Sequence, residues 1–89
     1  MSESIETTLQ QRGERYGRFE EHARISQLLK DACRALDGWE RLSSDQRESI
    51  EMILHKLARI FNGDPNYDDS WRDIAGYAQL VCNRLTNEG

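Results

Sequence analysis

The sequence predicts an all-α protein, a three- to four-helix bundle. Three segments carry apolar residues at spacings of three and four, which places those residues on one face of a helix. The links between the segments are short enough for antiparallel neighbours. We therefore expect helices over residues 19–36, 44–62 and 69–85, with a short N-terminal helix as a fourth element.

The ends of the first two helices carry recognisable signals. Asp37 and Gly38 follow the first apolar stripe and predict its end. Ser43 and Gln46 have the spacing of a capping box, which predicts the start of the second helix. Gly63 is expected to end that helix in a left-handed conformation, and Pro65 prevents its continuation.

The third helix is expected to begin near Asp69 and to reach Leu85. Gly76 lies inside it and costs stability relative to alanine, which predicts a close approach by the second helix or by another copy of the chain. The apolar positions expected to face the core are Trp71, Ile74, Ala75, Ala78, Val81 and Leu85.

Residues 1–18 are less regular. Ile5 and Leu9 have helical spacing, so this segment is expected to form a short helix interrupted at Gly13 and Gly17, or else a flexible arm.

Composition limits the domain organisation and the partners. The chain has 89 residues, 37% of them apolar, and a mean hydropathy of −0.83. One domain over residues 1–89 with a small core follows, and association into a homo-oligomer would add buried area.

A net charge of −4 argues against non-specific binding to nucleic acid. The sequence shows no apolar run of membrane-spanning length and no signal peptide, so we expect a cytoplasmic protein without a membrane role.

Four acidic residues form two pairs with helical spacing. On facing helices such pairs can hold Mg²⁺ through oxygen ligands. The alternative is that these acids cap helices and complement the helix dipole. The candidate metal ligands are Glu48, Glu51, Asp69 and Asp73.

Lys56 and Arg59 are three residues apart near the end of the second helix. They can bind a phosphate or an acidic partner, or they can complement the negative end of the helix dipole and pair with Asp73 or Asp64.

A second group of cations lies near the start of the chain. Arg12, Arg15 and Arg18 recur every three residues around Tyr16, and this pattern suits stacking on a base, docking on a protein, or a solvated arm.

The turn between the second and third helices is expected to be a rigid structural corner. Its residues combine a helix-ending glycine, a proline and a helix-starting serine and tryptophan. They are Gly63, Asp64, Pro65, Ser70 and Trp71.

The two histidines, His22 and His55, are expected to stand apart from each other and from Cys33 and Cys82, with no zinc-ligand spacing. The order of residues also indicates no Ser-His-Asp grouping, no P-loop and no dinucleotide fingerprint.

Two segments carry a resemblance to a known family. They are RGERYGRFEEHA, at residues 12–23, and IEMILHKLARIFNGDPNYDDSWRDIAGYAQLV, at residues 50–81. They resemble a family of small proteins of tailed phages and prophages that is filed as a domain of unknown function. That family is similar to nucleotide-modification-associated domains and, more distantly, to all-α nucleotide pyrophosphohydrolases of the MazG type.

The resemblance to MazG-type enzymes implies a role for the residues already named. Those enzymes hold Mg²⁺ against nucleotide phosphates with acids from two neighbouring helices. The corresponding positions would be Glu48, Glu51, Asp69 and Asp73, with Lys56 and Arg59 toward the phosphate. The MazG motif Glu-Glu-x-x-Glu is not complete here, because Glu20-Glu21 is followed by Arg24.

We therefore expect a phage-type accessory protein that binds a host or phage protein and modulates a host enzyme or a defence system. The alternatives are a MazG-like nucleotide-binding protein, with or without Mg²⁺-dependent pyrophosphohydrolase activity, and a structural oligomer subunit.

Overall fold

The computed structural model describes residues 4–88 and confirms an all-α fold. One short 3₁₀ helix, η1, joins the first long helix of the bundle to the second. The elements in chain order are α1 (Ile5–Tyr16), α2 (Phe19–Arg34), η1 (Asp37–Arg41), α3 (Ser44–Asn62) and α4 (Asp68–Glu88).

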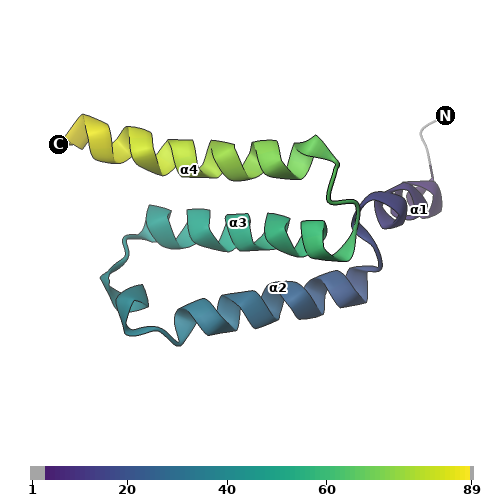
Figure 1. Ribbon diagram of the computed structural model, residues 1–89, viewed down its shortest axis with the longest axis horizontal. Helices are drawn as coiled ribbons and strands as arrows, with labels where there is room; N and C mark the ends of the chain where they lie inside the picture. The colour runs from purple at the N-terminus through teal and green to yellow at the C-terminus, as the bar shows by residue number, and fades with distance from the viewer. Residues whose placement is uncertain (1–3, 89) are drawn as a thin grey trace.

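The three long helices lie side by side in antiparallel order, with α3 between α2 and α4 (Figure 1). The shorter α1 packs at one end of this layer, where α2 begins and α3 ends. The molecule measures 48 × 28 × 25 Å, and its radius of gyration of 15.4 Å exceeds the value of about 12 Å expected for a compact domain of this length. The layer is therefore extended and open.

The helix boundaries follow the local signals closely. The second predicted helix, 44–62, agrees with α3 at both ends, and Gln46 accepts a hydrogen bond from the Ser43 amide at 2.9 Å, as in a capping box. The first predicted helix ends two residues early, at Arg34, before the chain turns into η1. Arg47 holds that turn by donating to the carbonyl oxygens of Trp39 and Glu40 at 3.3 Å.

The N-terminal segment differs from the prediction at one glycine. The helix α1 continues through Gly13, so the predicted interruption there is wrong, and it ends at Gly17 as expected. An isolated glycine is tolerated inside a helix because its backbone still makes the helical hydrogen bonds, and the Gly13 carbonyl accepts from the Gly17 amide at 2.9 Å. Gly17 itself has a φ of 79°, a conformation that favours glycine.

The turns at Gly17 and Gly63 pack against each other at close range. Gly63 has a φ of −131°, so the predicted left-handed conformation is wrong. It is required instead by a close approach, since a Cβ atom at this position would lie 2.5 Å from the Tyr16 Cα. Asn62 donates from Nδ2 to the carbonyl oxygens of Tyr16 and Arg18, both at 2.9 Å, and the Asp64 amide donates to the Arg15 carbonyl at 2.8 Å. These bonds fix α1 against the end of α3.

The corner that follows is closed by its own side chains. The Trp71 indole donates to the Pro65 carbonyl at 2.9 Å, and the Asp64 carboxylate accepts from the Asn66 amide at 2.9 Å. Ser70 is buried at the start of α4. The turn and the first residues of α4 are thus held together by local hydrogen bonds.

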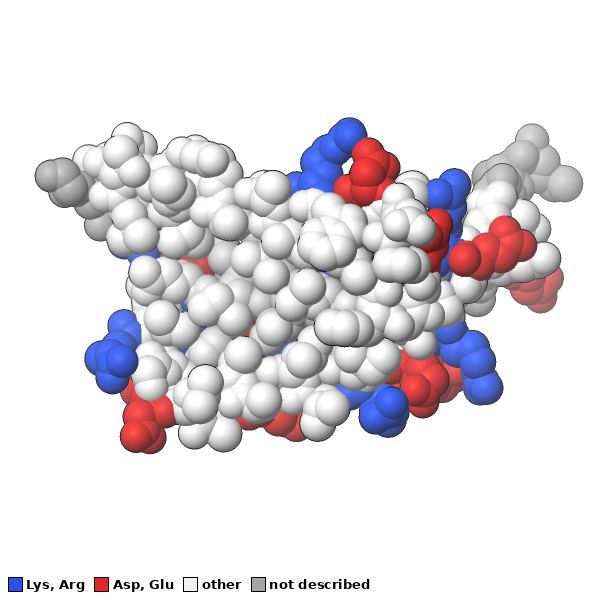
Figure 2. Space-filling model, in the orientation of Figure 1, with Lys and Arg blue, Asp and Glu red and all other residues white. Residues whose placement is uncertain are grey.

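The core of a single chain is small. Among the described residues, Leu54 and Ala58 are the buried apolar side chains, and no large side chain is fully buried. The predicted inner face of α4 is largely exposed, including Trp71 and Leu85. A Cβ atom added at Gly76 would meet no neighbouring atom within 4 Å, so the expected approach by the second helix does not occur. In Figure 2, the face turned to the viewer carries its charged side chains mostly along the edges.

Within residues 4–88, no helix combines the length and the hydropathy that a bilayer-spanning segment needs.

Candidate functional site: a cationic cleft

An open cleft of about 740 Å³ lies where α1 meets the last turns of α3 and the first turns of α4. It contains six of the site residues predicted from the sequence. Its lining is mostly polar and charged. The lining residues are Thr8, Gln11, Arg12, Glu14, Arg15, Tyr16, Lys56, Arg59, Asp69 and Asp73.

Two tyrosines hold two of the arginines in place. The Arg59 guanidinium carbon lies 4.2 Å from the ring centroid of Tyr16, and that of Arg15 lies 4.1 Å from the ring of Tyr67. The two rings are 6.3 Å apart and tilted toward each other. Cation–π contacts of this kind orient a guanidinium while its N–H groups stay available to a ligand.

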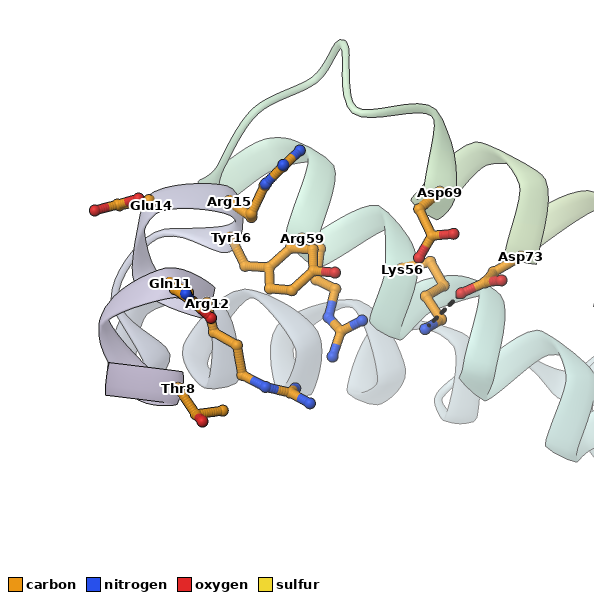
Figure 3. Close-up of a pocket in the computed structure, with 10 residues that line it drawn as sticks. All are labelled: Thr8, Gln11, Arg12, Glu14, Arg15, Tyr16, Lys56, Arg59, Asp69 and Asp73. Carbon is orange, nitrogen blue, oxygen red and sulfur yellow. Dashed lines mark ion pairs between the residues drawn. The ribbon is translucent and has the colours of Figure 1, made fainter. Parts of the chain in front are cut away.

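Arg12 and Arg59 extend from α1 and α3 toward the same open space (Figure 3). Among the described side chains, no carboxylate lies within ion-pair distance of Arg12, Arg15 or Arg59. Glu14 lines the rim but points away from the cleft in Figure 3. The cleft therefore offers guanidinium groups that are not neutralised by neighbouring carboxylates.

The lysine of the predicted pair has a different role. Lys56 Nζ lies 2.9 Å from an Asp73 carboxylate oxygen, and the Lys56 side chain is only 11% exposed. This ion pair joins α3 to α4 at the inner wall of the cleft (Figure 3). Lys56 is therefore largely neutralised by Asp73, one of the partners considered for it from the sequence.

The four predicted metal ligands are not brought together. Glu51 accepts hydrogen bonds from Arg34 of α2, whereas Asp73 pairs with Lys56 on the side of α4. Asp69 lines the cleft with Asp73, and Glu48 is exposed on α3. In the part of the chain that the structure describes, no three His, Cys, Asp or Glu side chains gather in a way that could hold a metal ion.

Arg18 also lies outside the cleft. It follows Gly17, where the chain changes direction, and its guanidinium is 3.4 Å from the Glu20 carboxylate. Of the three arginines predicted on the arm, the cleft therefore contains Arg12 and Arg15.

The structure brings the two histidines into contact, so the expectation that they stand apart is wrong. The rings of His22 and His55 meet edge to face with centroids 4.5 Å apart. Burial lowers the pKa of both imidazoles, that of His55 to about 4, and the nearby cations Arg59 and Lys56 act in the same direction. His22 Nδ1 is buried without a hydrogen-bond partner among the described residues.

The histidine pair borders a second, more apolar cavity of about 350 Å³ beneath α1. Arg12, Tyr16 and Arg59 line both hollows and so separate them. The sequence contains one signal for this arrangement, because His22 lies three residues before Ile25 and so shares a face with the apolar stripe of α2. Its pairing with His55, 33 residues later, depends on how α2 and α3 pack.

Fold and cleft together define a small all-α protein with a cationic cleft at one end of an open helical layer. The chain belongs to the family described as domain of unknown function DUF6378, whose model matches residues 1–84. The expected relationship to a family filed as a domain of unknown function is thereby confirmed. No curated protein and no solved structure matches the chain.

Proposed function

We propose that this protein is a small binding module that holds an acidic group of a partner protein in the cleft of α1, α3 and α4. The observation that carries the proposal is the pair Arg12 and Arg59, which face one open space without a carboxylate partner among the described side chains. Guanidinium groups bind carboxylates and phosphates through two parallel hydrogen bonds. The resemblance to phage proteins supports a partner from the host or the phage, and binding would modulate a host enzyme or a defence system.

The charge balance of the cleft favours a carboxylate over a triphosphate. Asp69 lines the same wall as Asp73, and Lys56 is already occupied by Asp73. A triphosphate would place several negative charges near these two carboxylates, and like charges at short range repel. One carboxylate held between Arg12 and Arg59 meets less of this repulsion.

A nucleotide is the second candidate ligand. The volume of the cleft, about 740 Å³, lies within the range of small-molecule sites. The pyrophosphohydrolase alternative has less support, because Glu51 and Asp73 are engaged by cations on opposite sides of α3.

The test is calorimetric titration of the full chain with three probes: a short peptide rich in Asp and Glu, inorganic phosphate, and ATP with Mg²⁺. We expect the peptide to bind, and Arg12→Gln to weaken binding about tenfold or more, since a hydrogen bond to a charged group contributes about 1.5–3 kcal/mol. The control is Arg41→Gln, an exposed arginine in η1 at the other end of the layer.

The three probes separate the candidates. Binding of ATP but not of the peptide, again weakened by Arg12→Gln, would replace the protein partner with a nucleotide. Absence of binding by all three probes, or equal weakening by Arg12→Gln and Arg41→Gln, would contradict the cleft as an anion site.

A further inference from the structure

The two sides of α3 differ in what covers them. Lys56 faces α4 and Glu51 faces α2 through their ion pairs. With 3.6 residues per turn, Arg59 falls between these two directions on the side of the cleft. Ile53 and Leu57 fall between them on the opposite side, where they are only half-buried. The apolar stripe of the central helix therefore faces away from the cleft.

The neighbouring helices continue this apolar surface. On α4, Asp73 and Leu80 together line a further shallow hollow beside the cleft. Asp73 also lines the cleft itself, so these two residues mark the cleft side of α4. A stripe with helical spacing runs along the opposite side of α4. On α2, the buried His22 meets His55 of α3. The apolar stripe of α2 lies about a quarter turn from His22, on the side opposite to Arg34, and so faces the same side of the layer. The members of the two stripes are Trp71, Ile74, Ala78, Val81 and Leu85 of α4, and Ile25, Leu28, Leu29 and Ala32 of α2.

Figure 2 shows one broad face of the helical layer on which charged side chains lie mostly at the margin. Several large apolar side chains are strongly exposed in the single chain, such as Phe61 at 71% and Leu85 at 47%. The largest apolar patch of an ordinary monomer covers about 300–600 Å², and a broader one marks an interaction surface.

The accessible surface of the single chain is larger than its mass predicts for a compact monomer. The chain exposes 6593 Å², whereas a folded monomer of 10.4 kDa exposes about 5,400 Å². The excess is about 1,200 Å² per chain. Two chains that covered it on each other would bury about 2,400 Å², which lies in the range of obligate homodimers, about 2,000–5,000 Å².

We infer that a second copy of this chain covers the apolar face of α2, α3 and α4. Obligate homodimer interfaces resemble a domain core cut in half. Here the open face includes the half-buried apolar stripe of the central helix α3. A twofold axis through this face would place the same residues of both copies against one another. The cationic cleft lies on the other side of α3, so a dimer carries two clefts that face outward.

The proposal is tested on the full chain by light scattering and by thermal unfolding over a wide range of protein concentration. We expect a mass of twice 10.4 kDa and an unfolding midpoint that rises with protein concentration, because dissociation and unfolding are coupled. A mass of 10.4 kDa at every concentration, with a constant midpoint, would overturn the proposal and leave the face to a partner of another sequence.

Two leucines of α4 provide a matched pair of variants. Leu85 lies on the apolar face and Leu80 on the cleft side, and Leu80 is the more exposed of the two in the single chain, 63% against 47%. We expect Leu85→Glu to weaken the dimer at least tenfold, or to unfold it at low concentration, and Leu80→Glu to leave it unchanged. Equal effects of the two variants, or no effect of Leu85→Glu, would contradict this interface.

Discussion

Replacing Gly63 by alanine tests the close contact between Gly63 and the end of α1, which positions α1 at the cleft. The φ of Gly63, −131°, is accessible to any residue, so the effect of the substitution is steric. The added Cβ would clash with the carbonyl oxygen of Arg15 and lie 2.5 Å from the Cα of Tyr16, and both are backbone atoms that a side-chain rotation cannot move. The end of α1 must therefore shift.

This shift would break the hydrogen bonds that join the end of α1 to residues 62–64. The Asp64 amide would lose its 2.8 Å bond to Arg15, and Asn62 would lose its two carbonyl partners. Overpacking costs about 1–3 kcal/mol, and each lost hydrogen bond about 1 kcal/mol. We expect Gly63→Ala to lower the free energy of unfolding by about 4–6 kcal/mol, which is comparable with the lower part of the about 4–13 kcal/mol typical of a chain of this length.

The matched control is Gly76→Ala. Gly76 lies inside α4, and a Cβ atom there would have no neighbouring atom within 4 Å, so alanine should stabilise the helix by up to about 1 kcal/mol. Urea unfolding followed by circular dichroism, at one fixed protein concentration, measures both variants. The steric reasoning fails if Gly63→Ala stays within about 0.5 kcal/mol of the unsubstituted chain, or if both variants shift stability in the same direction.

Two further predictions concern buried charge. The pKa of His55 is about 4 in the folded chain against 6.5 for a free imidazole, so the unfolded chain takes up protons first. The contribution of His55 to the free energy of unfolding should be fully present above pH 6.5. The free energy of unfolding should fall by about 1–2 kcal/mol between pH 7 and pH 5, measured by urea unfolding. His55→Gln should make that fall smaller without abolishing it, because burial also lowers the pKa of His22, and a fall as large as that of the unsubstituted chain would disprove the role of His55. Asp73→Asn removes the carboxylate beside the buried Lys56, and we expect a loss of about 1–2 kcal/mol in thermal unfolding. The exposed i, i+4 pair Arg72–Asp68 is the comparison, and Asp68→Asn should change stability by less than about 0.5 kcal/mol.

The local features of the sequence determined most of the secondary structure. The apolar spacing and the Ser43–Gln46 box located α3 at both ends, since these signals act within one turn of helix. Gly63 was correctly predicted as a helix end, but its backbone conformation was not, because the need for glycine comes from α1, which is distant in the sequence. The interruption predicted at Gly13 failed because propensity is a weak influence inside an otherwise regular helix.

The sequence also named most of the cleft residues without showing how they combine. Periodicity fixes which residues share a face of one helix, so Lys56 and Arg59 could be grouped from their spacing. Their neighbours could not be inferred in this way. Arg12 reaches the same cleft from α1, and Glu51 turns to Arg34 and away from Asp73, because packing decides which helix lies on each side of α3.

The apolar stripes show the same division between sequence and tertiary structure. The sequence by itself determined that three amphipathic helices each need a covered face. Only the tertiary structure decided that these faces lie together on one open side of a layer, with Leu54 and Ala58 as the buried apolar residues of the described chain. The physical reason is that the spacing of apolar residues specifies which face of a helix must be covered. The packing of the helices decides whether the same chain can cover that face.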